Sequence, residues 1–356
     1  MRRIINGAIF ASALLISSCT EAVDNEGINA EDLKNLRAIV VSEGQFGYGT
    51  SSITTLSYEG IALQDVFYKN NKPLKLGDVA QSISKIGDNF YVPLNNSRKI
   101  QVFDAKTFKS VETMGIGMDV IPMYIQYLGG DSIAVTDQKS SSKLMIMDIN
   151  HGQERQIVRR TVDLNGRSFQ MQLINNKLFV GGDNMSVFDL GDISRSGMRL
   201  LKTKDGQNIQ TVDFSKVVLD HKNRLWVLGH HAVFCIDPAT EKTVYEINIS
   251  DLGINTWVSC IDISPDKKTI YFNSGRKVYT IHTDNPVKPE APVFSYEGDK
   301  EKTIYAMAVS KENTLFFSEV LYGSLTRSVI FEYDPLSGKC LRSFKAGIFS
   351  HYFYFE

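Results

Sequence analysis

A pair of short apolar strands recurs at a nearly constant interval through this chain. Each copy has a polar turn, an apolar strand, a loop and a second apolar strand, as in "NNKLFVGGDNMSVFDL" (175–190). The residues at the centre of the first strand of each copy are Val40, Tyr91, Ala134, Phe179, Trp226, Tyr271 and Phe316, at intervals of 51, 43, 45, 47, 45 and 45. A strand repeat of about 40–50 residues is typical of propeller blades. The sequence therefore predicts an all-β fold, a seven-bladed β-propeller, because two separate sandwich domains would not keep one period.

The two ends of the repeat predict how the ring closes. In the sixth copy an inner strand, "VSCIDIS" (258–264), precedes the polar turn. The first copy has no such inner strand and opens at residue 37 on the apolar strand that contains Val40. The last residues, "FSHYFYFE" (349–356), have alternating aromatics and follow the outer strand of the seventh copy. Because an open ring would leave sheet edges unpaired, we predict that this C-terminal segment is the inner strand of blade one.

The N-terminus has the layout of a bacterial lipoprotein signal. In "MRRIINGAIFASALLISSC", two arginines precede an apolar run too short to span a membrane, and Cys19 ends a lipobox-like "LISSC". We expect residues 1–18 to be a signal peptide and Cys19 to be lipidated, with a plain secretory signal as the alternative. Residues 19–36 are polar and acidic and are expected to form a flexible tether, so that the propeller spans 37–356.

Charge and cysteine content argue against two classes of protein, polybasic nucleic-acid binders and disulfide-stabilised domains. The 356 residues carry 39 Lys and Arg against 40 Asp and Glu, a net charge of −1, which does not suit a polybasic nucleic-acid binder. The other cysteines, Cys235, Cys260 and Cys340, are odd in number and widely spaced, unlike a disulfide framework. Each lies in an apolar strand-like run, so we expect three buried free thiols.

One face of the ring, which we call the loop face, is predicted to carry the function. Its loops within blades, such as 42–52 and 318–327, and its connections between blades are longer and more varied than the turns at the opposite end. Aromatic side chains offer contact area, and Arg, Asn and His offer directed hydrogen bonds, which suits a bulky, partly polar ligand. The candidate ligand-binding residues are Phe46, Tyr48, Asn96, Arg98, Gln138, Asp183, Asn184, His230, His231, Trp257, Arg276, Tyr322, Arg327, Phe349 and His351.

Motifs for catalysis, metals and nucleotides have little support. "GHH" (229–231) would need His351 or Asp183 from other blades to complete a metal site, and the sequence has no G-x-S-x-G nucleophile elbow. "SEGQFGYGTSS" (42–52) resembles a phosphate-binding loop, but it lies between two predicted strands and has no lysine before Thr50. We therefore expect no catalytic residue, metal or cofactor, and we interpret this loop as a tight turn that presents two aromatic residues.

The opening blade resembles a known group of bacterial propellers. The matching positions in "SEGQFGYGTSSITTLSYEG" are Glu43, Gly44, Phe46, Gly47, Ser51, Leu56 and Tyr58. With the lipobox and the ending "AGIFSHYFYFE", they are similar to the YncE-like β-propeller lipoproteins of Bacteroidetes, although serine stands at position 42 where asparagine is common. One branch of that group is the cell-surface cobalamin-binding propeller, which sits on a TonB-dependent outer-membrane transporter. The resemblance implies an outer-membrane lipoprotein, at the cell surface or facing the periplasm, and a corrinoid ligand.

Three classes of function remain open at this point. The first is a non-enzymatic lipoprotein that binds a nutrient or cofactor on the loop face and acts beside a TonB-dependent transporter. The second is a metal-dependent propeller lyase or hydrolase that uses His230, His231 or His351. The third is a scaffold that docks other proteins.

Overall fold

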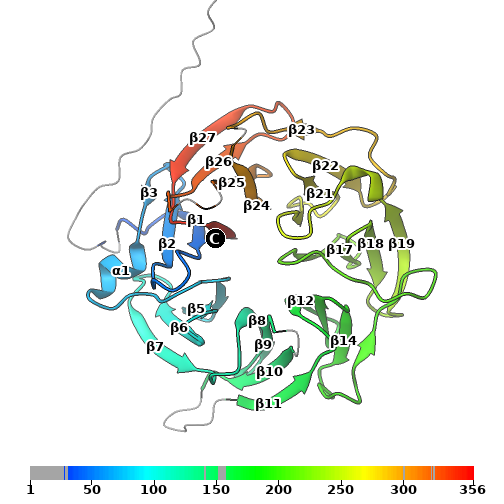
Figure 1. Cartoon of the computed structure of the whole chain (residues 1–356), viewed down its shortest axis with the longest axis horizontal. Helices are drawn as coiled ribbons and strands as arrows, with labels where there is room; N and C mark the ends of the chain where they lie inside the picture. The colour runs from blue at the N-terminus through cyan, green and yellow to red at the C-terminus, as the bar shows by residue number, and fades with distance from the viewer. Residues whose placement is uncertain are drawn as a thin grey trace, which may run out of the picture.

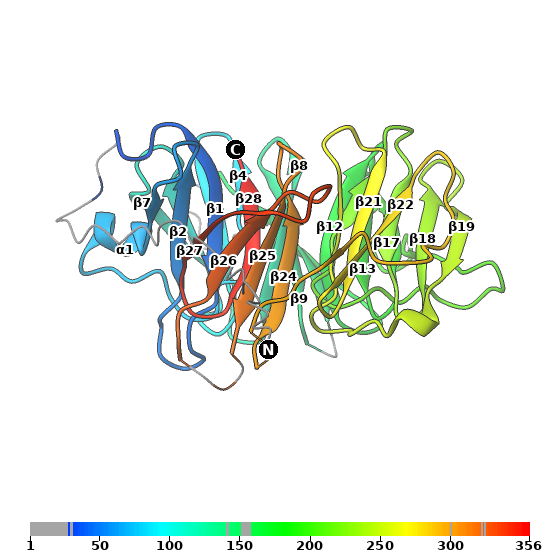
Figure 2. The ribbon, with the colours of Figure 1, turned by 90° about the horizontal axis from the view of Figure 1, so that it is seen from above.

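The chain folds into a ring of β-sheets around a central channel. The computed structural model describes residues 28, 31–139, 142–150, 158–299, 301–321, 323 and 325–356. Within these residues there are seven four-stranded sheets, arranged radially like blades (Figure 1). From the side, the strands run along the ring axis and the loops gather at its two ends (Figure 2). The predicted seven-bladed β-propeller is confirmed.

Each blade is an antiparallel sheet that starts at the channel and ends at the rim. Blade one contains β28 (Ser350–Phe355), β1 (Leu36–Ser42), β2 (Ser52–Ser57) and β3 (Ala62–Leu63). Blade two contains β4 (Ser84–Ile86), β5 (Asn89–Leu94), β6 (Lys99–Asp104) and β7 (Ser110–Gly115). Blade three contains β8 (Pro122–Gly129), β9 (Ser132–Asp137), β10 (Lys143–Asp148) and β11 (Val158–Asp163). Blade four contains β12 (Ser168–Ile174), β13 (Lys177–Gly182), β14 (Ser186–Asp189) and β15 (Arg199–Leu200).

The remaining blades have the same order of strands. Blade five contains β16 (Val217–Leu219), β17 (Leu225–Leu228), β18 (Ala232–Asp237) and β19 (Lys242–Asn248). Blade six contains β20 (Ile261–Ile263), β21 (Thr269–Ser274), β22 (Lys277–His282) and β23 (Phe294–Ser295). Blade seven contains β24 (Thr303–Val309), β25 (Leu315–Val320), β26 (Val329–Tyr333) and β27 (Cys340–Lys345). A short helix, α1 (Val66–Asn71), follows β3, and a 3-10 turn (Ser250–Leu252) follows β19.

The C-terminal strand closes blade one, as predicted. β28 pairs antiparallel with β1, so that Val40 lies opposite Phe353 and Ala38 opposite Phe355. Phe353 is buried, and its ring meets Phe316 of blade seven edge-on, with 6.0 Å between the centroids. The two ends of the chain therefore share one sheet, and the inner edge of β1 is paired.

Apolar side chains fill the spaces between neighbouring blades. All seven central residues of the sequence repeat, from Val40 to Phe316, are buried. Trp226 is fully buried, stacks on Tyr245 and donates a hydrogen bond from Nε1 to Asp220 Oδ2 at 2.9 Å. The repeat thus marks core positions, because each blade must bury the β-branched and aromatic residues of its second strand against its neighbours.

A buried ion pair links blade one to blade seven. Arg37 of β1 donates to both carboxylate oxygens of Glu332 on β26, at 2.8 and 2.5 Å, and to Glu312 at 3.0 Å. Burial raises the pKa of Glu332, but hydrogen bonds from Arg37 and Thr314 and the charges of Arg37 and Arg342 together hold this pKa below its ordinary value. The bidentate geometry joins the two blades beside the site where the ring closes.

The described residues that precede β1 lie against the propeller. Within the range expected to be a tether, Leu33 is buried and the Ile28 N–H donates to Asn70 Oδ1 at 2.9 Å. The expected signal peptide, residues 1–18, and Cys19 lie outside the described residues. None of the helices in the described ranges is long and apolar enough to cross a membrane.

The three cysteines within the described ranges are free thiols, but they differ in burial. Cys235 is buried, Cys260 is partly exposed and Cys340 is exposed. The expectation of three buried thiols was therefore wrong for two of them. Cys340 begins β27, the outermost strand of blade seven, and most residues of that strand face solvent or are half-buried.

Candidate functional site

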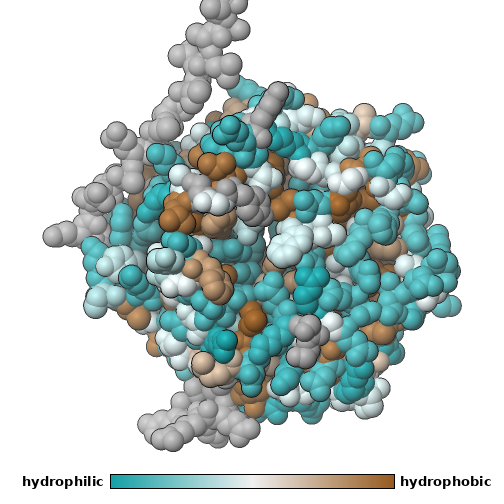
Figure 3. All heavy atoms as spheres, in the orientation of Figure 1, coloured by the Kyte–Doolittle hydropathy of each residue, from teal (hydrophilic) through white to brown (hydrophobic). Residues whose placement is uncertain are grey.

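The loop face is built from the loops between the second and third strands of each blade and the connections between blades. These segments meet at one end of the channel because successive strands of an antiparallel sheet alternate in direction. In blade one they are hydrogen bonded to each other: the Glu43 N–H donates to the Phe349 carbonyl at 3.0 Å, and the Ser51 N–H donates to the Gly77 carbonyl at 3.1 Å. Viewed down the ring axis, hydrophobic and hydrophilic residues are mixed around the centre (Figure 3).

The glycine-rich loop between β1 and β2 is shaped by its backbone. Gly44 has a φ of 80°, and a Cβ there would lie 2.4 Å from the carbonyl carbon of Thr50, so the turn requires glycine. Gly47 has a φ of 87°, and its N–H donates to Asp78 Oδ2 at 2.8 Å. The loop presents Phe46 and Tyr48, which are 70% and 66% exposed. It joins two strands, so the interpretation as an aromatic-presenting turn agrees with its context.

A polar group framed by aromatic rings occupies the channel where it meets the loop face. We call it the channel-mouth cluster; its members are Glu43, Gln81, Phe214, Tyr305, Phe349 and His351. The Tyr305 hydroxyl donates to Glu43 Oε2 at 3.1 Å, and Gln81 Nε2 donates to Glu43 Oε1 at 3.3 Å. His351 Nδ1 lies 3.7 Å from Glu43 Oε1. Blades one, two, five and seven all contribute to the cluster.

Aromatic rings surround His351 within this cluster. The Phe214 ring meets the His351 ring edge-on, with 6.0 Å between centroids. The Tyr305 ring lies 6.2 Å from His351 and 5.8 Å from Phe349. Burial among these rings lowers the polarity around the polar atoms between them, which strengthens electrostatic interactions there.

Burial changes the pKa of the Glu43 carboxyl and of the His351 imidazole. It raises the pKa of Glu43 to about 7, although the hydrogen bonds from Tyr305 and Gln81 oppose this increase. It lowers the pKa of His351 to about 4. Near neutral pH the imidazole is therefore uncharged while Glu43 exchanges its proton. Among the described residues, no lysine or arginine forms an ion pair with Glu43.

Three polar atoms of the cluster have no hydrogen-bond partner within the described part of the chain. They are both ring nitrogens of His351 and Oε1 of Gln81. The His351 side chain is 6% exposed and Gln81 is 3% exposed. Because buried polar atoms in folded proteins are nearly always paired, these atoms indicate where water or a ligand group binds.

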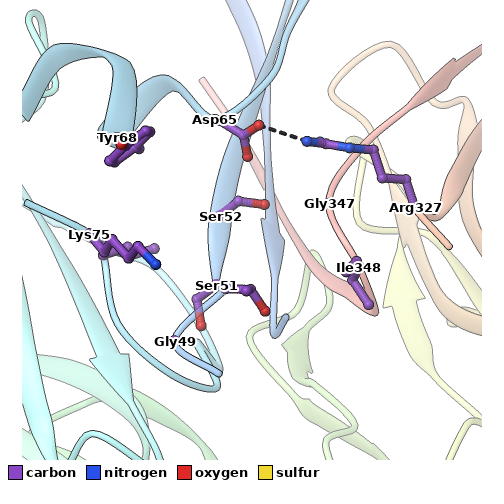
Figure 4. Close-up of a pocket in the computed structure, with 11 residues that line it drawn as sticks. Gly49, Ser51, Ser52, Asp65, Tyr68, Lys75, Arg327, Gly347 and Ile348 are labelled. Atoms are coloured by element: carbon purple, nitrogen blue, oxygen red, sulfur yellow. Dashed lines mark hydrogen bonds and ion pairs between the residues drawn. The ribbon is translucent and has the colours of Figure 1, made fainter. Parts of the chain in front are cut away.

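A pocket of about 270 Å³, the blade-one pocket, opens beside the glycine-rich loop. Its lining includes Ser51 and Ser52, Asp65 at the start of α1, Tyr68 within α1, Lys75, and Arg327 from blade seven (Figure 4). Arg327 Nη2 lies 2.8 Å from Asp65 Oδ2, and this ion pair spans one side of the pocket. Of the residues predicted from the sequence, the structure places Arg327 here.

A larger polar pocket, of about 520 Å³, lies between blades four and five. It brings together three predicted residues, Asn184, His230 and His231, with Lys202 and Asn208. Asn208 Nδ2 donates to Asn184 Oδ1 at 2.7 Å, and the two histidine rings lie 6.3 Å apart, nearly perpendicular. Within the described ranges, no group of three or more His, Cys, Asp or Glu residues is placed to hold a metal ion.

The other predicted residues lie apart from these three sites. Asn96 donates to Asp78, and Arg98 donates to the carbonyl of Met118. Gln138 Oε1 accepts a hydrogen bond from Asn95 at 3.0 Å. Trp257 is exposed, and Tyr322 lies outside the described residues. The predicted set is thus distributed around the ring, and Phe349 and His351 are the pair that reaches the channel mouth.

Two predicted residues are engaged in holding loops together. Asp183 accepts hydrogen bonds from the Arg167 backbone at 2.9 Å and from its guanidinium at 2.8 Å. Arg276 donates to the carbonyls of Gly298 and Lys302, each at 2.7 Å, and lies over the Tyr296 ring. These partners come from neighbouring connections that the repeat pattern does not reveal, and a ligand would have to compete with them.

Sequence reasoning missed the polar centre of the channel mouth. Glu43 lies inside the loop that was singled out, yet its partners Gln81 and Tyr305 are 38 and 262 residues away. It also missed Lys75 and Tyr68 of the blade-one pocket. The available signal was that Glu43 directly follows β1, the strand with which the C-terminal segment was expected to pair.

Comparison with known proteins identifies the family. Residues 38–333 match the family described as "Domain of unknown function (DUF5074)". The chain belongs to this DUF5074 family. No curated protein matches the sequence. The matched range begins in β1 and ends with β26, so the family pattern covers most of the ring.

Solved structures show the same fold at low sequence identity. Hydrazine synthase of Kuenenia stuttgartiensis is 15% identical, with a TM-score of 0.51 over 71% of this chain and 76% of that one. The propeller domain of Cps50 (Swd1), whose organism is printed as Myceliophteria thermophila, is 12% identical, with a TM-score of 0.55 over 74% and 86%. KlHsv2 with loop 6CD replaced by a Gly-Ser linker is 11% identical, with a TM-score of 0.51 over 90% and 94%. At these identities the likeness concerns the fold alone.

Proposed function

We propose that this DUF5074 protein is a non-enzymatic lipoprotein that binds a nutrient or cofactor at the loop face and acts beside a TonB-dependent outer-membrane transporter. The observation that carries the binding proposal is the channel-mouth cluster. Its Glu43 carboxyl has no lysine or arginine partner among the described residues, and three buried polar atoms beside it are unpaired. An unpaired buried polar atom costs on the order of 1–3 kcal/mol, which hydrogen bonds from a ligand would offset.

The surroundings of the cluster favour a bulky ligand with both apolar and polar surface. Phe46, Tyr48 and Trp257 are exposed aromatic residues on the same loop face. Exposed rings on a rigid scaffold contact a ligand at low entropic cost, while the buried polar atoms fix its orientation. A corrinoid, which combines a large flat ring with amide side chains, meets both requirements and is the ligand that the sequence resemblance implies.

The location and the partner rest on the N-terminal sequence and on the same resemblance. Cys19 in "LISSC" supports a lipid anchor, and the acidic segment after it supports presentation at the outer membrane. Co-purification from outer membranes tests the partner: the lipidated protein should carry a TonB-dependent transporter with it. A preparation that retains the lipoprotein and contains no such transporter would contradict this part.

Calorimetric titration with cyanocobalamin and with cobinamide tests the ligand. We expect binding at micromolar protein concentration, and we expect Phe46→Ala combined with Tyr48→Ala to raise Kd about tenfold, because aromatic contacts are lost. Leu336→Ala is the matched control, since Leu336 is an exposed apolar residue in the turn between β26 and β27, at the other end of the blade. The absence of heat with both corrinoids would remove the corrinoid version of the proposal.

A second variant tests whether the ligand reaches the channel mouth. Glu43→Gln keeps the shape of the side chain and removes its charge, so it should change Kd for a ligand that donates hydrogen bonds to the carboxyl. Unchanged affinity in both this variant and the aromatic double variant would place the bound ligand away from the channel mouth.

A further inference from the structure

The blade-one pocket has features of a second ligand site that the proposed function does not use. Its volume of about 270 Å³ lies just below the range of about 300–1,000 Å³ for drug-sized ligand sites, so it suits a smaller molecule. Tyr68, Leu76 and Ile348 supply its apolar wall, and Lys75 and Arg327 approach from opposite sides (Figure 4). The six members of the channel-mouth cluster are absent from its lining.

The charged side chains that line the pocket have a net positive charge. Asp65 is paired with Arg327 at 2.8 Å, so these two charges compensate each other. Lys75 is exposed, and within the described ranges no ion-pair partner is found for it. One positive charge therefore remains uncompensated at the edge of an otherwise small and largely apolar space.

A buried hydroxyl provides an independent indication of a ligand. Ser52 lines the pocket and is 8% exposed, and its Oγ has no hydrogen-bond partner within the described part of the chain. Gly347 lies against this hydroxyl: a Cβ at that position would come within 2.1 Å of Ser52 Oγ. The absence of a side chain at 347 is thus what leaves room for the hydroxyl at the pocket wall.

We propose that the blade-one pocket binds an organic monoanion, a carboxylate attached to a small apolar body. The ammonium group of Lys75 attracts the carboxylate, and the Ser52 hydroxyl is an unused donor for it. Tyr68 and Ile348 contact the apolar body. A cationic ligand would be repelled by Lys75. It would also find no free carboxylate to pair with, because Asp65 is already paired with Arg327.

Two probes of similar size and opposite charge test the proposal. Ligand-observed NMR titration of the purified protein should show that 3-phenylpropanoate binds and that 3-phenylpropylamine does not, and that added salt weakens the binding. Lys75→Gln should raise Kd for the acid about fivefold, the upper end for an exposed ion pair. Lys72→Gln is the matched control, because it removes the same charge three residues away and Lys72 is not part of the lining.

The outcomes separate this site from the channel mouth. Glu43→Gln should leave binding of 3-phenylpropanoate unchanged, whatever it does to a corrinoid, so each proposal can fail without the other. Tyr68→Ala should weaken binding of the acid about tenfold through the loss of aromatic contact. Three results would each overturn the proposal. They are equal binding of the acid and the amine, equal effects of Lys75→Gln and Lys72→Gln on Kd, and no binding of the acid at about 10 mM, which is ten times a weak Kd of about 1 mM.

Discussion

Glu43 and His351 should affect the pH dependence of stability in opposite directions. The carboxyl of Glu43 has a pKa raised by burial from an ordinary value of 4.5 to about 7, and the imidazole of His351 has a pKa lowered by burial from 6.5 to about 4. Both groups prefer to be neutral in the folded protein, because burial disfavours their charged forms.

The sign and size of each effect follow from linkage. Glu43 binds its proton more tightly in the folded state, so its contribution to the free energy of unfolding is greatest below pH 4.5 and is lost as the pH rises through 7. His351 binds its proton less tightly in the folded state, so its contribution is present above pH 6.5 and is lost as the pH falls through 4. At about 1.4 kcal/mol per pKa unit, each change amounts to about 3 kcal/mol. Between pH 4.5 and 6.5 the two slopes nearly cancel in the unmodified protein.

Removing one group at a time should expose the slope of the other. Urea denaturation from pH 4 to pH 8 measures the free energy of unfolding of the unmodified protein, Glu43→Gln and His351→Gln. Relative to the unmodified protein, Glu43→Gln should gain about 3 kcal/mol between pH 4.5 and 7, and His351→Gln should gain about as much between pH 6.5 and 4. If either variant differs from the unmodified protein by a constant amount across this range, the corresponding group is not buried neutral in the folded state.

Four further variants test the ring and the first loop. Deleting 350–356 should greatly lower the melting temperature, because β1 loses its partner and the space around Phe353 opens; an unchanged transition would refute closure by β28. Glu332→Ala should cost about 3–5 kcal/mol in urea denaturation, since it leaves the buried Arg37 guanidinium without its main partner, and a loss below about 1 kcal/mol would contradict this. Gly44→Ala should destabilise more than Gly47→Ala: both have positive φ, but a Cβ at 44 meets Thr50 while one at 47 meets nothing. Equal losses would show that φ alone matters.

The fold was predictable because the information is local and repeated. Each blade buries one apolar residue, such as Trp226 or Phe316, at the same place in its strand. The apolar pattern of a single strand is weak evidence for a fold, but seven copies at a constant interval are strong evidence. Closure by 349–356 was predictable for a related reason, since the pattern lacked one inner strand at its start and had one strand too many at its end. Cys340 shows where this reasoning stops: an apolar-looking run on the outermost strand of a blade is exposed.

The sequence was sufficient to predict which face of the ring carries the candidate site. It was not sufficient to predict which side chains contact each other there. Phe46 and Tyr48 are exposed on the expected loop because a glycine-rich turn between strands leaves them no core to enter. The side chain of Arg276, by contrast, is occupied by carbonyl groups of another connection, and no sequence spacing encodes that. Glu43 Oε1 and His351 Nδ1 lie 3.7 Å apart although the two residues are far apart in the sequence, and only the closed ring brings them together.

The strands that close the ring therefore also build the channel-mouth cluster. β28 supplies both the strand that completes blade one and the histidine of the cluster, while β1 leads directly into Glu43. A ligand held between these residues binds the closed ring and not a ring whose last strand has detached, so it must stabilise closure by mass action. At a free ligand concentration of 100 times Kd this amounts to about 2.7 kcal/mol. A channel-mouth ligand should thus protect the backbone amides of β28 from hydrogen exchange, whereas an acid bound in the blade-one pocket should protect β28 less, because β28 does not line that pocket.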